Sequence, residues 1–131
     1  MKSTKEIPFT HALILAIGNK STRQWRQNCG SVPVLDENSD IRYFNTGIPK
    51  GAADISGIVA PEGWRLEIEC KALGRKRTAE QAAWGAMIVR MGGVYVLCDA
   101  RDEPQDVAVA RCVLEVGEAI AARRAKRSEL C

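Results

Sequence analysis

Apolar residues recur at helical spacing in three segments of the chain, and strand-like patterns lie between them. The last segment shows this spacing most clearly, because Val107, Ala110, Leu114 and Ala121 recur at helical intervals. Thr78 precedes the second segment, where it fits the first position of a capping box. We predict helices over residues 10–20, 78–91 and 104–127.

Strand-like patterns fill the middle of the chain. Residues 64–71 alternate apolar and charged side chains, and residues 94–98 form a short apolar run rich in β-branched residues, which is typical of a buried strand. Pro61 and Gly63 favour a tight turn that joins two of the predicted strands into a hairpin. We predict strands over residues 25–35, with breaks at Gly30 and Pro33, and over residues 41–44, 53–59, 64–71 and 94–98.

This order of elements predicts a single α/β domain over residues 1–131, with a central mixed β-sheet flanked by helices. A chain of 131 residues is long enough to bury one hydrophobic core, and no repeat or linker divides it. The net charge of +3 permits an anionic partner without requiring one.

The cysteines predict a reduced, intracellular protein without a zinc site. The chain has five cysteines, no C-x-x-C pair, and His11 as its single histidine. Cys98 and Cys112 are expected in the core. The apolar run over residues 12–17 is too short to cross a bilayer, so we expect a cytoplasmic protein without a membrane partner.

The predicted hairpin brings two carboxylates together. A turn centred on residues 61–62 places Asp54 directly opposite Glu69, with Cβ atoms roughly 4.5–5.5 Å apart. A shift of one residue in the turn would pair Asp54 with Cys70 instead. Two such carboxylates repel each other unless a divalent cation binds both, and Mg²⁺ prefers these oxygen ligands. Lys71 follows on the same face, where its ammonium can hold a water or neutralise a phosphate.

An E-x-K triplet by itself is weak evidence, because Glu and Lys are both common. The alternative is an amphipathic strand whose charged face meets solvent. Glu67 shares that face and is expected to be solvated or paired with an arginine.

The motifs around the triplet carry more information. In order along the chain they are R-x-N-x-G, K-G-x-x-D-x-x-G, E-x-K, a glutamine about ten residues further on, and G-G before an apolar strand. The residues concerned are Arg26, Asn28 and Gly30; Lys50, Gly51, Asp54 and Gly57; Glu69 and Lys71; Gln81; and Gly92 and Gly93. This ordered set, spanning residues 25–98, resembles the virus-type replication-repair nuclease (VRR-NUC) domain of the PD-(D/E)xK nuclease superfamily.

The resemblance implies a restriction-endonuclease-like fold and cleavage of DNA that depends on Mg²⁺ or Mn²⁺. It implies that Asp54, Glu69 and the backbone carbonyl of Cys70 bind the metal. It further implies that Lys71 assists the nucleophilic water, and that Gln81 supports the site or touches the DNA. Stand-alone members of the family look like homodimers that cut branched DNA such as four-way junctions. The resemblance therefore also implies a homodimer and a branched substrate here.

The chain departs from the superfamily pattern at two positions. Ala53 precedes Asp54 where a proline is frequent, which affects the backbone more than the chemistry. Many relatives also supply an acid from the first helix, and Glu6, next to Pro8, is the single candidate here. Without that third acid, fewer ligands would be left for a second metal.

Several cations are expected to contact DNA. Arg75, Lys76 and Arg77 precede a helix N-terminus, where cations and backbone amides can receive phosphates; a plain solvated loop is the alternative. The KGxxD motif adds Lys50. Arg26 and Asn28 either line the DNA groove or hold the end of a strand.

Three functions therefore compete. The leading hypothesis is a Mg²⁺- or Mn²⁺-dependent DNA endonuclease acting on branched DNA. The second is a non-catalytic nucleic-acid-binding module on the same fold, whose binding would be sensitive to salt. The third is an unrelated α/β domain in which the charged row is only a surface.

Overall fold

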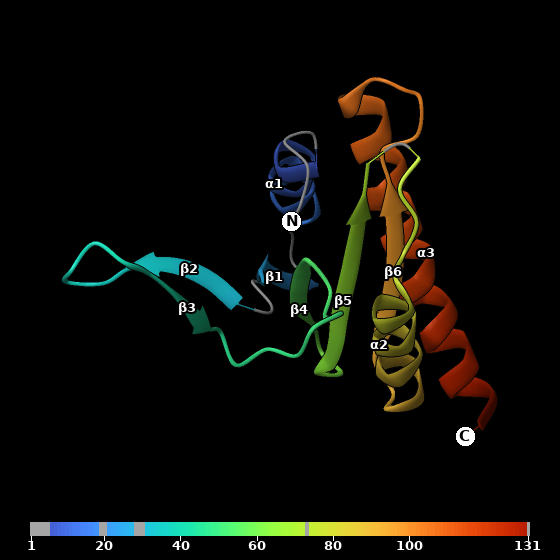
Figure 1. The fold of residues 1–131 in the computed structure, drawn as a ribbon. Coiled ribbons are helices and arrows are strands. Elements are labelled where there is room, and N and C mark those ends of the chain that lie inside the picture. The colour runs from blue at the N-terminus through green and yellow to red at the C-terminus, as the bar shows by residue number, and fades with distance from the viewer. Residues whose placement is uncertain (1–5, 19–20, 28–30, 73, 131) are drawn as a thin grey trace.

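The computed structural model describes residues 6–18, 21–27, 31–72 and 74–130. Within these residues the chain forms an α/β fold with three helices, a mixed four-stranded sheet and a separate two-stranded hairpin (Figure 1). In chain order the elements are α1 (Glu6–Ile17), β1 (Thr22–Arg26), β2 (Ser31–Leu35), β3 (Ile41–Asn45), β4 (Ile55–Val59), β5 (Trp64–Lys71), α2 (Ala79–Arg90), β6 (Val94–Asp99) and α3 (Gln105–Leu130).

The four-stranded sheet has the order β1-β4-β5-β6. The β1–β4 and β4–β5 pairs are antiparallel, whereas β5 and β6 run parallel and are joined through α2. In the β4–β5 hairpin Ile55 faces Ile68 and Ser56 faces Glu67. This is the register predicted from the turn, and extending it by one residue places Asp54 opposite Glu69.

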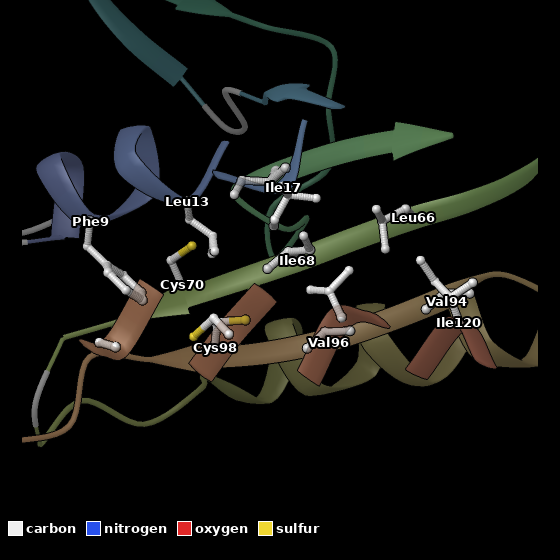
Figure 2. Packing of buried hydrophobic residues seen from close by; sticks show 14 of the residues in the cluster. Phe9, Leu13, Ile17, Leu66, Ile68, Cys70, Val94, Val96, Cys98 and Ile120 are labelled. Atoms are coloured by element: carbon white, nitrogen blue, oxygen red, sulfur yellow. The ribbon is translucent and has the colours of Figure 1, made fainter. Parts of the chain in front are cut away.

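The sheet separates two different faces. One face packs against α1 and α3, where Leu13, Ile68, Cys70 and Cys98 meet in the hydrophobic core (Figure 2). Because side chains alternate along a strand, Glu67, Glu69 and Lys71 lie on the other face. That face carries α2. The expected burial of Cys98 and Cys112 in the core is confirmed.

The first helix begins earlier and ends earlier than predicted. It spans Glu6–Ile17 rather than residues 10–20, and it includes Pro8 in its first turn. A proline is tolerated there because its missing N–H has no partner within the helix in any case. At the other end of the chain, α3 continues past residue 127 to Leu130. None of the helices in the described ranges has the length and hydropathy needed to cross a bilayer.

The predicted strand over residues 25–35 is two strands that belong to different sheets. β1 joins the four-stranded sheet, and β2 pairs only with β3. Pro33 does not interrupt β2, where it faces Tyr43. A proline fits this position because both strands of a two-stranded ribbon are edge strands.

An ion pair ties the β4–β5 turn to α3. Arg124 donates from Nε to Glu62 Oε2 over 2.6 Å and from Nη2 to the carbonyl of Ala60 over 2.9 Å. The hydrogen bond from Arg124 lowers the pKa of Glu62 to about 2. The turn is therefore held to the helix by a carboxylate that stays ionised far into the acidic range.

We expect Glu62→Gln to remove part of the acid sensitivity of folding. The pKa of Glu62 in the folded chain lies below its ordinary value of 4.5, so the ionised carboxylate stabilises the fold above pH 4.5. That contribution is lost as the pH falls toward 2. Thermal unfolding at a series of pH values should show a steeper fall in Tm for the wild type than for Glu62→Gln over this window. Parallel profiles would contradict the prediction.

Candidate functional site

Asp54 lies immediately before β4 and is fixed against β5. Its Oδ2 accepts a hydrogen bond from the backbone N–H of Cys70 at 2.8 Å. Its backbone carbonyl accepts one from the N–H of Gln27 at 2.7 Å, just beyond the end of β1. One bond comes from β5 and the other from the residue that follows β1. The carboxylate is consequently held beside the Glu69 position rather than left on a free loop.

Glu69 is the centre of a small buried polar cluster. The residue is fully buried, with 0% exposure, and its Oε1 lies 3.5 Å from Lys71 Nζ. Gln81 of α2 donates from Nε2 to the same oxygen over 3.1 Å. A buried carboxylate is stable only with such partners, and losing one partner of a buried ion pair is strongly destabilising. The sequence-predicted residues Asp54, Glu69, Lys71 and Gln81 are thus brought together.

Gln81 makes the contacts of a helix cap and also contacts Glu69. Thr78 caps α2 by accepting from the N–H of Gln81, and Gln81 Oε1 accepts from the N–H of Thr78 at 2.8 Å. The amide nitrogen of the same side chain reaches Glu69. One residue therefore connects the start of α2 to the middle of the buried cluster.

Two substitutions should separate these roles of Gln81. Gln81→Glu keeps an oxygen for the Thr78 N–H but removes the donor to Glu69 and adds a negative charge beside it. If this face is catalytic, we expect cleavage of DNA to fall roughly tenfold or more. Thr78→Ala should cost about 1 kcal/mol of stability through the lost cap. It should leave cleavage nearly unchanged well below Tm. Equal losses in both variants would show that Gln81 acts only as a cap.

Glu67 is buried, so the expectation that it meets solvent is wrong and its arginine-paired alternative is confirmed. Arg65 donates from Nε to Glu67 Oε1 over 2.9 Å, and the Ser56 hydroxyl lies 3.4 Å from the same oxygen. Burial raises the pKa of Glu67, although Arg65 acts in the opposite direction. Gln27 adds an amide contact to its other oxygen at 3.5 Å. Partners from β4, from β5 and from the residue that follows β1 thus enclose Glu67.

Four of the expected DNA-binding cations gather near the N-terminus of α2. Arg75, Lys76 and Arg77 are exposed in the loop before it. Lys50 comes from the loop before β4. Hydrogen bonds from its own backbone and from Thr78 lower the pKa of Glu80 in the first turn of α2, and the nearby charge of Lys50 lowers it further. These cations and the helix N-terminus form a positively charged region next to Gln81.

The remaining expected residues lie elsewhere or outside the described ranges. Arg26 contacts His11 of α1, with 3.4 Å between Nη1 and Nε2. Its side chain therefore points to the α1 face of the sheet, opposite Glu69. Asn28 lies outside the described residues. Glu6 begins α1, but its side chain lies outside the described residues, so its candidacy as a third acid stays a prediction.

The sequence motifs did not predict two residues that make contacts on the α2 face. Gln27 joins Asp54 to Glu67, although it is only a variable position within R-x-N. Tyr95 of β6 packs against Gly85, and the guanidinium of Arg77 lies 5.7 Å from the centre of its ring. Burial raises the pKa of Tyr95. Strand alternation places Tyr95 on the Glu69 face, which was the one available signal for it.

A second cluster lies on the core side of the sheet and was not expected from cysteine spacing. The ligand atoms of Cys98, Cys112 and Glu115 all lie within 4.8 Å of one another. Arg111 already brings a positive charge to them: its Nη1 lies 3.8 Å from Cys112 Sγ and 3.1 Å from Glu115 Oε1. A guanidinium cannot lose its proton in a protein, so a metal ion would have to displace it. This cluster is an arginine-centred network that joins α3 to the end of β6.

The donor set on the α2 face fits a hard divalent cation. Asp54 and Glu69 supply carboxylate oxygens, which Mg²⁺ and Mn²⁺ prefer. The thiols of Cys70 and Cys98 point away into the core (Figure 2). Softer metals, which favour sulfur, therefore have no matching ligands from these thiols on the α2 face.

No family model, curated protein or solved structure matches this chain.

Proposed function

We propose that this protein is a Mg²⁺- or Mn²⁺-dependent DNA endonuclease with a restriction-endonuclease-like fold, similar to the VRR-NUC domain. The observation that carries the proposal is the register of the β4–β5 hairpin. It sets Asp54 opposite Glu69, with Lys71 and Gln81 in contact with the Glu69 carboxylate. An incidental charged strand would instead expose its row of charges to solvent.

Each residue has a chemical task in this proposal. Asp54 and Glu69 hold the ion, together with the Cys70 carbonyl implied by the resemblance. The bound ion supplies neutralisation of phosphate charge and a more acidic water. Lys71 would orient an attacking water or stabilise the charge that develops on the phosphate. Gln81 holds the Glu69 carboxylate in one orientation by donating to it.

The positive region formed by Lys50, Arg75, Lys76 and Arg77 supplies a path for the DNA backbone. These cations lie at the start of α2, whose backbone N–H groups and dipole also favour phosphate. They come from two loops, one that precedes β4 and one that follows β5. A branched substrate is proposed from the resemblance, and Arg26 and Asn28 stay predictions without support from this arrangement.

The function is tested by incubating the protein with labelled four-way junction, flap, single-stranded and duplex DNA. Each substrate is tried with Mg²⁺, with Mn²⁺ and with a chelator. Cleavage that requires the metal supports the proposal, and the substrate ranking reports the preferred structure. Salt-sensitive binding without cleavage would favour the non-catalytic binding module instead. If neither binding nor cleavage occurs with any substrate, the charged face has no role in nucleic-acid chemistry.

A further inference from the structure

The hydroxyl group of Tyr95 is buried, and none of the described residues forms a hydrogen bond with its oxygen. A buried polar group without a hydrogen bond costs free energy, and such groups are rare in native proteins. A phenylalanine would fill the same space without that cost. The hydroxyl group therefore indicates a ligand that supplies the missing partner.

Tyr95 lies on the face of the sheet that carries the candidate site. In the parallel β5–β6 pair Tyr95 is the register partner of Glu67, and Glu69 follows on the same face of β5. Burial raises the pKa of Tyr95, the Arg77 guanidinium lowers it, and the carboxylates of Glu69 and Asp54 raise it further. The phenol is therefore protonated at neutral pH, and its O–H is a donor within the field of both candidate metal ligands.

Gly85 of α2 leaves the space that the Tyr95 ring occupies. A Cβ at Gly85 would lie 2.6 Å from Cε1 of the ring and 2.7 Å from its Cζ. Gln81 precedes Gly85 by one helical turn on the same side of α2, and it donates to Glu69. The ring consequently lies between α2 and β6, one turn of the helix away from the contact between Gln81 and Glu69.

Arg77 brings a positive charge to the same phenol. Its side chain is exposed, and its guanidinium lies 5.7 Å from the centre of the Tyr95 ring. A guanidinium only donates hydrogen bonds, so Arg77 cannot accept the phenol proton. A group that satisfies both side chains must offer acceptor oxygens and a negative charge. A phosphodiester has both, because its two non-bridging oxygens can accept from the guanidinium and from the phenol.

We infer that Tyr95 and Arg77 together bind one backbone phosphate of the DNA strand at the candidate site. The inference rests on the proposed function, which supplies the phosphodiester, and it gives Tyr95 a role that no sequence motif indicated. Tyr95 donates its O–H to one non-bridging oxygen, and Arg77 donates to the other. Within the positively charged region at the start of α2, Arg77 thereby acts at a defined phosphate rather than as a general attraction for DNA.

The test compares Tyr95→Phe with Tyr43→Phe, which changes the only other tyrosine of the chain. Tyr43 of β3 is 74% exposed, so it is a control for the loss of a hydroxyl group alone. Tyr95→Phe should have the Tm of the wild type or a higher one, because the hydroxyl has no partner in the free protein. Its kcat/KM for the DNA that the wild type cuts best should fall about ten- to a hundredfold. Tyr43→Phe should match the wild type in both measurements.

Double variants test whether Tyr95 and Arg77 bind the same phosphate. Arg77→Gln should weaken DNA binding and reduce the slope of log Kd against log salt concentration by about 1. Adding Tyr95→Phe to Arg77→Gln should lower kcat/KM by a smaller factor than it does in the wild type, because the two residues share one ligand. Adding it to Arg75→Gln should lower kcat/KM by the full factor. Arg75 is an exposed cation of the same loop and is the matched control.

Three results would overturn the inference while the nuclease function stands, provided that the wild type cuts DNA with the metal. The first is a Tyr95→Phe variant that cuts as well as the wild type. The second is a fall in the Tm of Tyr95→Phe, which would show that the hydroxyl has a partner inside the protein. The third is independent, fully multiplicative losses from Tyr95→Phe and Arg77→Gln. A wild type that neither binds nor cuts DNA would overturn the proposed function and this inference with it.

Discussion

Replacing Glu69 with glutamine is expected to lower metal-dependent cleavage of DNA by at least about 100-fold. Under the proposed function Glu69 holds the divalent cation, and a neutral amide oxygen is a much weaker ligand for it. The Gln81 donor and the shape of the side chain are retained. The loss should appear in cleavage rates measured over a range of Mn²⁺ concentrations, without a matching loss of DNA binding.

Glu67→Gln is the matched control for this substitution. Glu67 is also a fully buried glutamate, on the same face of β5 and two residues away. Its partners are Arg65, Ser56 and Gln27 rather than Lys71 and Gln81. We expect cleavage by Glu67→Gln to be close to that of the wild type. If Glu67→Gln is as inactive as Glu69→Gln, then burial of charge, and not metal binding, explains the loss.

Stability has to be separated from chemistry, because Glu69 and Lys71 form a buried ion pair. Removing one charge of such a pair costs about 3–5 kcal/mol when the other is left buried. The double variant Glu69→Gln with Lys71→Gln removes both charges and should regain much of the stability that Glu69→Gln loses. It should regain no cleavage. A double variant that cuts DNA would refute the roles assigned to both residues.

Replacing Gly51 with alanine is expected to destabilise the fold by about 2–5 kcal/mol, the sum of a backbone and a packing cost. Gly51 has φ of +95°, which L-residues with a side chain rarely adopt. A Cβ there would also lie 2.6 Å from both the backbone carbon and oxygen of Glu80. That backbone belongs to the first turn of α2 and cannot move without moving the helix.

Gly47→Ala isolates the packing part of this effect. Gly47 lies in the same loop with φ of +82°, but a Cβ there would meet nothing within 4 Å. Its loss should be limited to the backbone cost, about 1–2 kcal/mol. Urea unfolding of both variants measures the difference. Indistinguishable losses would mean that the loop does not approach α2 as closely as described.

The consequence of Gly51→Ala should extend to the candidate site. The loop that contains Gly51 continues to Asp54, and α2 contributes Gln81 to Glu69. Moving this loop away from α2 would change the positions of Asp54 and Gln81 relative to Glu69. Cleavage by Gly51→Ala should therefore fall even at temperatures where the variant is folded, whereas Gly47→Ala should cut normally under the same conditions.

The sequence by itself determined the local features of this protein. The turn between β4 and β5 set the register that brings Asp54 opposite Glu69. The capping box at Thr78 and Gln81 located the start of α2. These features follow from hydrogen bonds and alternation over a few residues, so nearby residue types are enough to specify them.

Only the tertiary structure decided which face each strand presents to its neighbours. Glu67 is enclosed because Ser56 of β4 and Gln27, which follows β1, meet it across the sheet, and Arg26 is directed away from Glu69 toward His11 of α1. The detachment of β2–β3 from the main sheet likewise depends on which strands pair across the chain. Such contacts join segments far apart in sequence, and a pattern of a few residues carries no information about which distant partner will meet it.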